Sequence, residues 1–249
     1  MSILDSFCLD GRVALVSGAS RGIGYAIARG LAEAGAQVYG IGRSAATEAA
    51  EEAFHYRQCD VRDGAAVSQL LAEIVERHGH FDILVNAAGI TLPGQVDAEP
   101  LASFQRTLEL NLTAAYACCC LALPHMQRNG YGTIINVTSI GAGLGFPGNP
   151  GYVASKGGLA AMTRALALDL GGQGIRVNNL VPGYVHTAMT HASYANPELH
   201  AARAGRTMLG RWGSVDELAS AAVFLASSAS SYITGTDLVV DGGWSAKGL

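Results

Sequence analysis

Short, continuously apolar runs alternate along the chain with longer stretches in which apolar residues recur at helical spacing. Continuous apolar runs are typical of strands buried on both faces of a parallel sheet, and the stretches between them are typical of amphipathic helices. The pattern predicts repeated strand–helix–strand units and an α/β fold with a parallel sheet. The clearest predicted helix is 65–78, and the predicted strands are 13–16, 37–41, 54–59, 81–85 and 133–137.

The composition of the 249 residues is that of a globular protein, with 49% hydrophobic and 14% charged residues, and one large domain accounts for the length. The net charge is -4 and there is no basic run, which argues against nucleic-acid binding. Residues 1–10 carry two acids and no basic residue, unlike a signal or transit peptide, so we expect a cytoplasmic protein. The longest apolar segment, 114–124, has eleven residues; this is too short to cross a bilayer and predicts a buried helix.

Five cysteines include three consecutive ones at 118–120. In a helix these three side chains point about 100° apart, so they cannot bind one metal ion together. We predict small apolar packing residues on a buried helix, with neither a metal site nor a disulfide framework.

Three glycines follow the first predicted strand where the chain turns into a helix. Their spacing, Gly18-x-x-x-Gly22-x-Gly24, is a variant of the dinucleotide-binding fingerprint. Glycine permits a tight turn and lets the backbone approach a pyrophosphate at the positive end of the helix. The position predicts a nucleotide-binding loop, although glycine-rich turns also occur without a ligand. The candidate cofactor-binding residues here are Gly18, Ser20, Arg21, Gly22, Ile23 and Gly24.

The end of the second predicted strand indicates the type of cofactor. An acid there accepts hydrogen bonds from the ribose 2′-hydroxyl of NAD, whereas an arginine suits the 2′-phosphate of NADP. This chain reads Gly42-Arg43-Ser44 without a carboxylate, and Arg21 is a second candidate cation. The residues favour NADP over NAD. The alternative is that Arg43 is solvated and stacks on the adenine without distinguishing the two cofactors.

Ser139, Tyr152 and Lys156 are candidates for one proton transfer. Tyr152 and Lys156 are four positions apart, so a helix opened by Gly151 places both on one face. A tyrosine has an ordinary pKa of about 10, and a nearby ammonium lowers that pKa. Ser139 lies just beyond the strand 133–137, where its hydroxyl can hold a carbonyl oxygen beside the phenol. On its own, Tyr-x-x-x-Lys also occurs in ordinary helices.

Three further segments lie at ends of predicted elements. Asp60 and Val61 follow the third strand and are placed to contact the edge of an adenine. Small residues in Asn86-Ala87-Ala88-Gly89, after the fourth strand, allow close packing against a bound dinucleotide. Asn111 interrupts an apolar stretch within 101–127, where we predict two consecutive helical segments. It either hydrogen bonds within the core or kinks the helix and holds a water near Lys156.

With the glycine loop, Asn86-Ala87-Ala88-Gly89, Asn111, Ser139 and Tyr152-x-x-x-Lys156 in this order, the chain resembles the classical short-chain dehydrogenase/reductase family over essentially its full length. The resemblance implies one Rossmann-like, doubly wound domain over 1–249, of about seven parallel strands with helices on both faces. Its cofactor half would span about 10–150, and its catalytic helix and substrate lid about 151–213.

The resemblance also implies roles for individual residues. Tyr152 would exchange a proton with the reacting oxygen, which Ser139 orients. Lys156 would lower the tyrosine pKa and bind the nicotinamide ribose, and Asn111 would support a water relay. Hydride transfer belongs to the cofactor, NADP or NAD. Beyond the residues already named, the implied cofactor contacts are Pro182, Gly183, Val185 and Thr187.

Later segments agree with the resemblance. Asn178 and Pro182-Gly183 are expected to follow a sixth strand, and Asp241-Gly242-Gly243 to close the last one. The family is commonly tetrameric through two helices, which correspond here to 108–127 and 152–171, so we expect a homotetramer. The small or apolar residues expected on their exposed faces are Ala115, Cys119, Ala161 and Leu168.

The substrate is expected to contact the loop after Ser139 and a lid between Tyr184 and Trp212. The lid carries three arginines and three histidines against one acid, Glu198, as far as Gly213. It either recognises an anionic group or is a solvated helix. The candidate substrate residues are Gly141, Phe146, Asn149, Tyr184, His186, His191, Arg211 and Trp212.

These features predict an NAD(P)-dependent oxidoreductase that interconverts a secondary alcohol with a ketone, aldehyde or lactone. A small sugar, polyol or hydroxy acid, anionic or neutral, is the expected substrate. One alternative is a 3-oxoacyl-[acyl-carrier-protein] reductase, which needs a basic docking patch; Arg128, Arg203 and Arg206 are scattered candidates. Another is a catalytically silent nucleotide sensor.

Overall fold

The computed structural model describes residues 2–45, 47–92 and 99–248. Within them, seven parallel strands form one sheet in the order β3-β2-β1-β4-β5-β6-β7. The predicted parallel α/β architecture is confirmed, with the doubly wound strand order of a Rossmann fold. The strands are β1 Val13–Ser17, β2 Gln37–Gly42, β3 His55–Gln58, β4 Ile83–Asn86, β5 Gly132–Val137, β6 Ile175–Pro182 and β7 Asp237–Val240.

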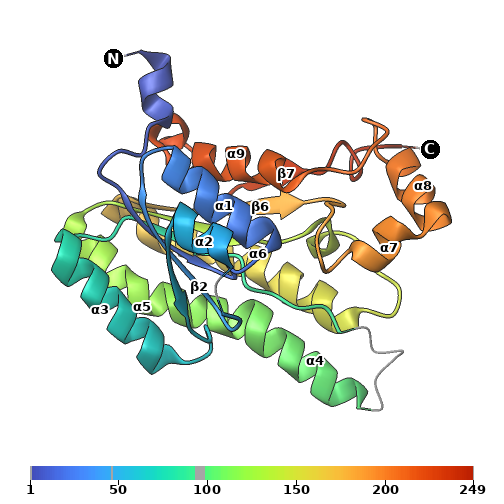
Figure 1. Ribbon diagram of the computed structural model, residues 1–249, viewed down its shortest axis with the longest axis horizontal. Helices are drawn as coiled ribbons and strands as arrows, with labels where there is room; N and C mark the ends of the chain where they lie inside the picture. The colour runs from blue at the N-terminus through green and yellow to red at the C-terminus, as the bar shows by residue number, and fades with distance from the viewer. Residues whose placement is uncertain (1, 46, 93–98, 249) are drawn as a thin grey trace.

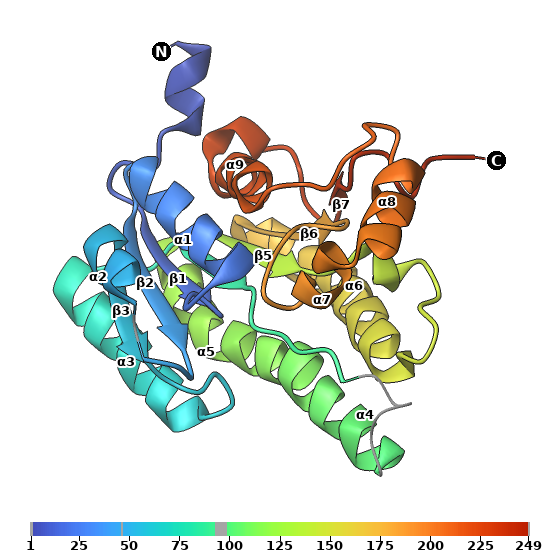
Figure 2. The ribbon, with the colours of Figure 1, turned by 45° about the vertical axis from the view of Figure 1, so that its right-hand side comes forward.

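Helices cover both faces of the sheet (Figure 1). Residues of α1 and α9 pack on one face, and residues of α3, α5 and α6 pack on the other. The short helices α7 and α8 lie apart from these layers, close to the C-terminal segment (Figure 2). The helices are α1 Gly22–Glu33, α2 Glu48–Ala53, α3 Gly64–His78, α4 Pro100–Leu108, α5 Ala114–Asn129, α6 Pro150–Leu170, α7 His191–Ala195, α8 Pro197–Arg206 and α9 Val215–Ala226.

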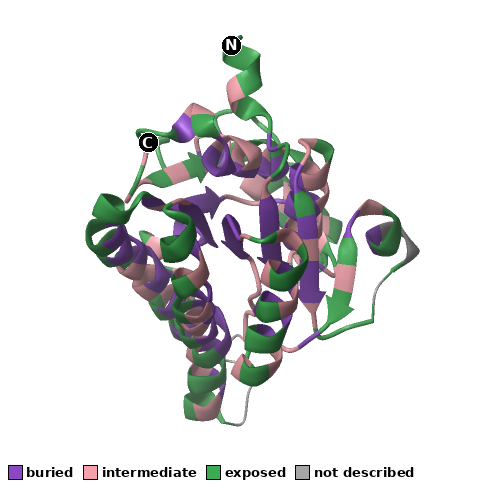
Figure 3. Ribbon diagram, turned by 90° about the vertical axis from the view of Figure 1, so that its left-hand side faces the viewer, coloured by how far each residue is buried: buried purple, intermediate pink, exposed green. Residues whose placement is uncertain are grey.

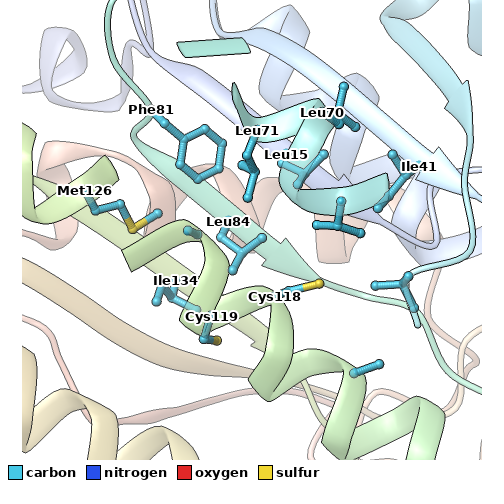
Figure 4. Packing of buried hydrophobic residues seen from close by; sticks show 14 of the residues in the cluster. Leu15, Ile41, Leu70, Leu71, Phe81, Leu84, Cys118, Cys119, Met126 and Ile134 are labelled. Atoms are coloured by element: carbon cyan, nitrogen blue, oxygen red, sulfur yellow. The ribbon is translucent and has the colours of Figure 1, made fainter. Parts of the chain in front are cut away.

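The central strands divide the hydrophobic core into two halves because successive side chains point to opposite faces. Leu15, Leu84 and Ile134 face α3 and α5, while Val16 and Val85 face α1 and α9. Figure 4 shows the first half, where Phe81 and Met126 close its edge. Both faces of these strands are buried (Figure 3), which explains why they are continuously apolar.

Cys118 and Cys119 belong to this core, where burial raises the pKa of each thiol to about 12. All five cysteines are free. The prediction that Cys119 lies on an exposed helix face is therefore wrong, and Ala115 is buried too, because this side of α5 faces the sheet. On α6, in contrast, Ala161 and Leu168 are exposed as expected.

The segment from α4 to α5 is one helical run that a π-turn, Glu109–Thr113, interrupts at Asn111. The predicted pair of helical segments with a distortion at Asn111 is confirmed. The run Pro100–Asn129 has 30 residues and a mean hydropathy of 1.2 over its most apolar window, so its length and composition alone would allow it to span a membrane. Core helices of globular proteins pass the same test, and 44% of this window is buried inside the protein.

Each of the five predicted strands differs from the structure by one or two residues at an end; the fourth, predicted over 81–85, spans Ile83–Asn86 and so includes Asn86. The third strand begins at His55, because Phe54 ends α2 and turns its ring into the core. Asn178 and Pro182 lie within β6 rather than after it, since β6 runs for eight residues along β5. Asp241 directly follows β7, as expected.

Candidate active site

The turn between β1 and α1 is held by glycine. Gly18 has φ +72°, and a Cβ there would lie 2.8 Å from the backbone of Ala88. Gly22 has φ +62°, and a Cβ there would lie 3.6 Å from Cγ2 of Thr187. Arg21 occupies the N-cap of α1 and makes no capping hydrogen bond with its side chain. The turn thus offers helix N–H groups and a surface without side chains, which fits a pyrophosphate.

Ser17, at the end of β1, connects this turn to the loop after β4. Its Oγ accepts hydrogen bonds from the N–H groups of Ala87 at 3.2 Å and Ala88 at 3.3 Å. Nearby, the buried amide of Asn86 donates to Asn136 Oδ1 at 2.9 Å. The sequence motif Asn86-Ala87-Ala88-Gly89 is thereby fixed against the glycine turn, at the point where the strand order reverses.

Arg43 lies just beyond β2 and is exposed, as is Arg21 at the glycine turn. The backbone of this edge is fixed: Gln58 donates to the carbonyl of Arg43 at 2.7 Å, and Tyr56 to that of Ser44 at 2.8 Å. The described residues place no carboxylate in a salt bridge with either arginine. The two cations therefore fit a phosphate on the ribose.

Asp60 and Val61, the predicted adenine contacts, directly follow β3 and Cys59, and Val61 is buried. Asp60, however, is paired with Arg62 at 2.6 Å, and the hydrogen bond from that guanidinium lowers the pKa of the carboxyl. The carboxylate is thus engaged by its neighbour.

Asn111 is held within the π-turn by three hydrogen bonds. Its Oδ1 accepts from the N–H of Ile90 at 2.8 Å, while Nδ2 donates to the carbonyl of Ile90 at 2.9 Å and to Ser155 Oγ at 3.1 Å. A Cβ on Gly89 would lie 3.3 Å from Asn111 Oδ1 and 3.6 Å from Lys156 Nζ. The loop after β4, the π-turn and the helix α6 therefore meet at Lys156.

Ser139, Tyr152 and Lys156 come together at the carboxyl end of β5. Ser139 caps a short 3₁₀ turn, where its Oγ accepts from the N–H of Gly141 at 3.0 Å. Tyr152 and Lys156 lie one turn apart on α6, with Nζ 5.9 Å from the centroid of the tyrosine ring. Lys156 is buried and donates to the carbonyl of Val137 at 2.7 Å.

The two titratable groups have shifted pKa values. Burial lowers the pKa of Lys156 to about 8. Burial also raises the pKa of Tyr152, and the hydrogen bond with Ser139 acts in the opposite direction. The expectation of a depressed tyrosine pKa is therefore not met in the protein alone, because Nζ is directed to the Val137 carbonyl rather than to the phenol. Tyr152 is a protonated acid at neutral pH.

Aromatic rings lie beside Tyr152. Phe146 stacks on Tyr152 with 6.3 Å between ring centroids and 9° between planes, and its centroid lies 6.5 Å from that of Tyr184. Tyr184 in turn contacts Trp212 at 5.4 Å and Trp244 at 4.6 Å. Sequence reasoning missed Trp244; its signal is its position directly after the glycines that close β7.

Asn149 precedes α6, and its Nδ2 donates to Thr91 Oγ1 at 2.7 Å. Its Oδ1 is buried, and no described residue donates a hydrogen bond to it. At Gly141 a Cβ would lie 3.1 Å from the ring of Phe146 and 3.4 Å from Ser139 Oγ, so the close approach of Phe146 requires glycine there. An acceptor without a described partner thus lies three residues before Tyr152, beside a tightly packed ring.

The predicted lid residues separate into two groups. His186 stacks on Tyr194, with 3.8 Å between ring centroids, and His191 lies 5.8 Å from His186. Arg211 is not part of this aromatic cluster: it pairs with Glu217 through contacts of 2.6 and 3.0 Å. It lines a separate cavity with Glu217 and Asp241, to which Ser139, Tyr152 and Lys156 do not contribute. The structure thus directs the Arg211 guanidinium to α9 and away from the proton-transfer residues.

Within the described ranges there is no group of three or more His, Cys, Asp or Glu side chains suited to a metal ion. The fold and this arrangement define a nicotinamide-dependent oxidoreductase, with a dinucleotide cradle beside a Ser-Tyr-Lys set.

Comparisons with known proteins agree. The family model described as enoyl-(acyl carrier protein) reductase matches residues 18–245. Gluconate 5-dehydrogenase of Gluconobacter oxydans is 39% identical over 98% of both chains, and the 3-oxoacyl-[acyl-carrier-protein] reductase of Chlamydia pneumoniae is 36% identical over 94% of this chain and 97% of its own. The crystal structure of a gluconate 5-dehydrogenase from Burkholderia cenocepacia, in complex with NADP and tartrate, superposes with a TM-score of 0.90 at 37% identity, over 99% of this chain and 100% of that one.

The chain therefore belongs to the short-chain dehydrogenase/reductase family, and it is an NAD(P)-dependent enzyme that acts on CH–OH groups.

Proposed function

We propose that this enzyme interconverts a secondary alcohol and a ketone on a small sugar, polyol or hydroxy acid. The observation that carries the proposal is the Ser139-Tyr152-Lys156 set, with Asn149 three residues before Tyr152; the buried Oδ1 of Asn149 has no hydrogen-bond partner among the described residues. A substrate with several hydroxyl groups can satisfy that acceptor, because a buried polar atom without a partner is costly. Similarity to gluconate 5-dehydrogenases supports the same substrate class.

In this proposal Tyr152 moves the proton and Ser139 positions the reacting oxygen. Tyr152 donates the proton to the carbonyl oxygen in reduction and, as the phenolate, removes the hydroxyl proton in oxidation. The hydroxyl of Ser139 binds the same oxygen. The nicotinamide of NADP or NAD supplies or accepts the hydride when bound.

Lys156 and Asn111 connect the site to solvent in this scheme. Lys156 would bind the nicotinamide ribose, and its pKa of about 8 allows it to release and regain a proton near neutral pH. The side chain of Asn111 is fully used in fixing Ile90 and Ser155. Its contribution to a relay would therefore come through the π-turn, a helical distortion that is frequent at functional sites.

The cofactor is held, in this proposal, by the glycine turn, the loop 86–89 and the segment from Pro182 to Thr187. Arg43 and Arg21 favour NADP. Fluorescence titration with NADPH and NADH at matched salt tests this: we expect NADPH to bind at least about tenfold more tightly, a difference of about 1.4 kcal/mol. Arg43→Ala should remove the difference, whereas Arg57→Ala, an exposed arginine of β3 paired with Glu73, should keep it. Equal or tighter binding of NADH by the unchanged protein would disprove the assignment.

The substrate class is tested with the purified enzyme. Aldonates, alditols, aldoses and hydroxy acids are offered with NADP and NAD, and a β-ketoacyl thioester is offered with the reduced cofactors. Turnover of polyhydroxy compounds, with kcat/KM well above that of the thioester, is the expected result. Preference for the thioester would instead support the carrier-protein reductase, which the 36% identical relative keeps open.

We also propose a homotetramer that acts in the cytoplasm. Leu168 on α6 is 85% exposed and Tyr116 on α5 is 50% exposed, so these helices present apolar surface for a neighbouring subunit. The five free cysteines fit a reducing compartment. Light scattering coupled to size exclusion measures the oligomeric state directly.

A further inference from the structure

The three arginines of the lid have different environments. Arg211 is paired with Glu217, and Arg206 is exposed, with its guanidinium carbon 5.0 Å from the ring centroid of Trp244. Arg203, on α8, is partly buried. Its Nη1 is inaccessible to solvent, and no described residue accepts a hydrogen bond from it. Arg203 thus presents a buried donor without an acceptor.

The guanidinium of Arg203 lies in a corner between two rings. Its Cζ is 4.5 Å from the centroid of Tyr184 and 5.8 Å from that of Trp212. Contact with aromatic faces holds the cation in place, but a ring face provides no acceptor for N–H groups directed along the plane of the guanidinium. Nη1 therefore still lacks an acceptor among the described residues, and a planar anion that reaches this buried corner would supply one.

The Tyr184 ring connects this corner to the reacting centre. Tyr184 contacts Phe146, which stacks on Tyr152, so Arg203 borders the same line of rings at its far end. The chain of contacts runs from Tyr152 through Phe146 and Tyr184 to Arg203, with steps of 6.3, 6.5 and 4.5 Å. A substrate that extends along these rings from Tyr152 would direct its remote end toward Arg203.

No described carboxylate neutralises Arg203. Glu217 is engaged by Arg211, and Asp241 accepts hydrogen bonds from Gly243 and Ser245. The remaining acid of α8, Glu198, is exposed and makes no salt bridge within the described residues. The corner therefore carries net positive charge at low solvent exposure, where a charge-assisted hydrogen bond is strongest.

Hydrogen bonds within the protein also fix the segment that carries Arg203. Trp212 Nε1 donates to the carbonyl of His200 at 3.2 Å, and Lys247 Nζ donates to that of Gly205 at 2.6 Å. Asn196 caps α8 by accepting from Leu199 N–H at 3.0 Å. An arginine on such a support loses little conformational entropy when it binds a ligand.

We propose that Arg203 binds a carboxylate at the end of the substrate remote from Tyr152, and thereby selects polyhydroxy acids over neutral polyols. This inference rests on the proposed function, which it narrows to an anionic substrate class. The planar guanidinium forms two parallel hydrogen bonds with a carboxylate, which a neutral CH₂OH group cannot match.

The kinetic test compares a six-carbon aldonate with the neutral alditol of the same chain. In Arg203→Gln, kcat/KM for the aldonate should fall about tenfold to a hundredfold, while the value for the alditol stays close to that of the unchanged enzyme. Arg203→Lys keeps the positive charge but loses the two parallel N–H donors of the guanidinium. Its kcat/KM for the aldonate should lie between the values of the unchanged enzyme and of Arg203→Gln. Arg206→Gln is the matched control, since it removes the same charge from the same helix, and it should leave the preference for the aldonate intact.

The proposal is overturned if Arg203→Gln lowers kcat/KM equally for the aldonate and the alditol, because Arg203 would then only hold the lid in place. An equal loss in Arg206→Gln would overturn it too, since the effect would come from overall charge. The proposal is also overturned if the unchanged enzyme prefers the alditol to the aldonate, because the enzyme would then not select for a carboxylate. Thermal unfolding identifies a variant that does not fold, in which case Arg203→Lys decides between these outcomes.

A binding measurement separates this inference from the proposed function. Calorimetry with tartrate and with neutral threitol, in the presence of NADP, should give tighter binding of tartrate that Arg203→Gln abolishes and Arg206→Gln retains. This result supports the carboxylate site even if the enzyme oxidises no polyhydroxy compound. In that case only the proposed function is disproved. Equal binding of tartrate by both variants overturns the site and leaves the function unaffected.

Discussion

The proposed cofactor edge and the proposed substrate lid of this molecule are fixed in different ways. At the cofactor edge, backbone geometry decides: Gly18 at φ +72° approaches Ala88, and Ser17 connects two strand ends. In the lid, side chains decide, because Tyr184, Tyr194 and Trp212 pack ring against ring around Arg203. Backbone geometry tolerates only certain residue types, whereas a ring cluster can be built in many ways. The cofactor edge can therefore be predicted from the sequence, whereas the packing of the lid is specific to this chain.

Tyr152 stands between the two regions, so removing its hydroxyl should separate binding from chemistry. We expect Tyr152→Phe to lower kcat by about 10²- to 10⁴-fold, the usual contribution of a general acid or base. Affinity for NADPH should be retained, because the glycine turn is untouched. Tyr232→Phe, at a fully exposed tyrosine, is the control. Full activity in Tyr152→Phe would contradict the role of Tyr152 in proton transfer. If the protein is a catalytically silent nucleotide sensor, the unchanged protein itself will show no turnover.

Gly18→Ala should damage the cofactor edge and leave the lid intact. The added Cβ would lie 2.8 Å from the backbone of Ala88, and alanine at φ +72° costs about 1–2 kcal/mol in addition. We expect NADPH binding to weaken by about tenfold or more, while the near-ultraviolet circular dichroism of Trp212 and Trp244 is unchanged. Gly64→Ala, where nothing lies within 4 Å of the new Cβ, should bind normally. Unchanged affinity in Gly18→Ala would show that the turn does not contact the cofactor.

The pH dependence of turnover should report the raised pKa of Tyr152. Alcohol oxidation needs the phenolate, so its kcat/KM should rise about tenfold per pH unit at pH values below the tyrosine pKa. Carbonyl reduction needs the phenol and should fall only above that pKa. Cofactor affinity is measured at the same pH values, because Lys156 loses its charge above about pH 8. An oxidation rate that is already constant from pH 7 would indicate a depressed tyrosine pKa.

Of these changes, Arg211→Ala should have the smallest effect: it should lower the stability of the fold slightly and leave turnover unchanged. The pair with Glu217 is half-exposed, so its loss should cost at most about 1 kcal/mol in the free energy of unfolding at pH 7. Hydrogen bonds from Arg211, the larger effect, and from Ser214 together lower the pKa of Glu217 from 4.5 to about 2. This stabilisation is present above pH 4.5 and is lost as the pH falls toward 2, so the difference between the two proteins should shrink over that range. A specific loss of aldonate turnover would instead place Arg211 in the substrate site.

The order of strands and helices, the glycine turn and the Tyr152–Lys156 pair could all be predicted from the amino-acid sequence. Each of these depends on local rules: buried strands are continuously apolar, a positive φ favours glycine, and a spacing of four places two side chains on one helical face. The interruption at Asn111 was predictable for the same reason, because a buried amide in an apolar helix stands out.

The surroundings of each lid side chain, in contrast, follow from packing in three dimensions. Arg203, Arg206 and Arg211 look alike in the sequence, but packing pairs Arg211 with Glu217 and places Arg203 against Tyr184. The raised pKa of Tyr152 also depended on the fold, since burial disfavours the phenolate, and Lys156 Nζ donates to the carbonyl of Val137. These outcomes depend on contacts between residues far apart in the chain, which local spacing does not encode.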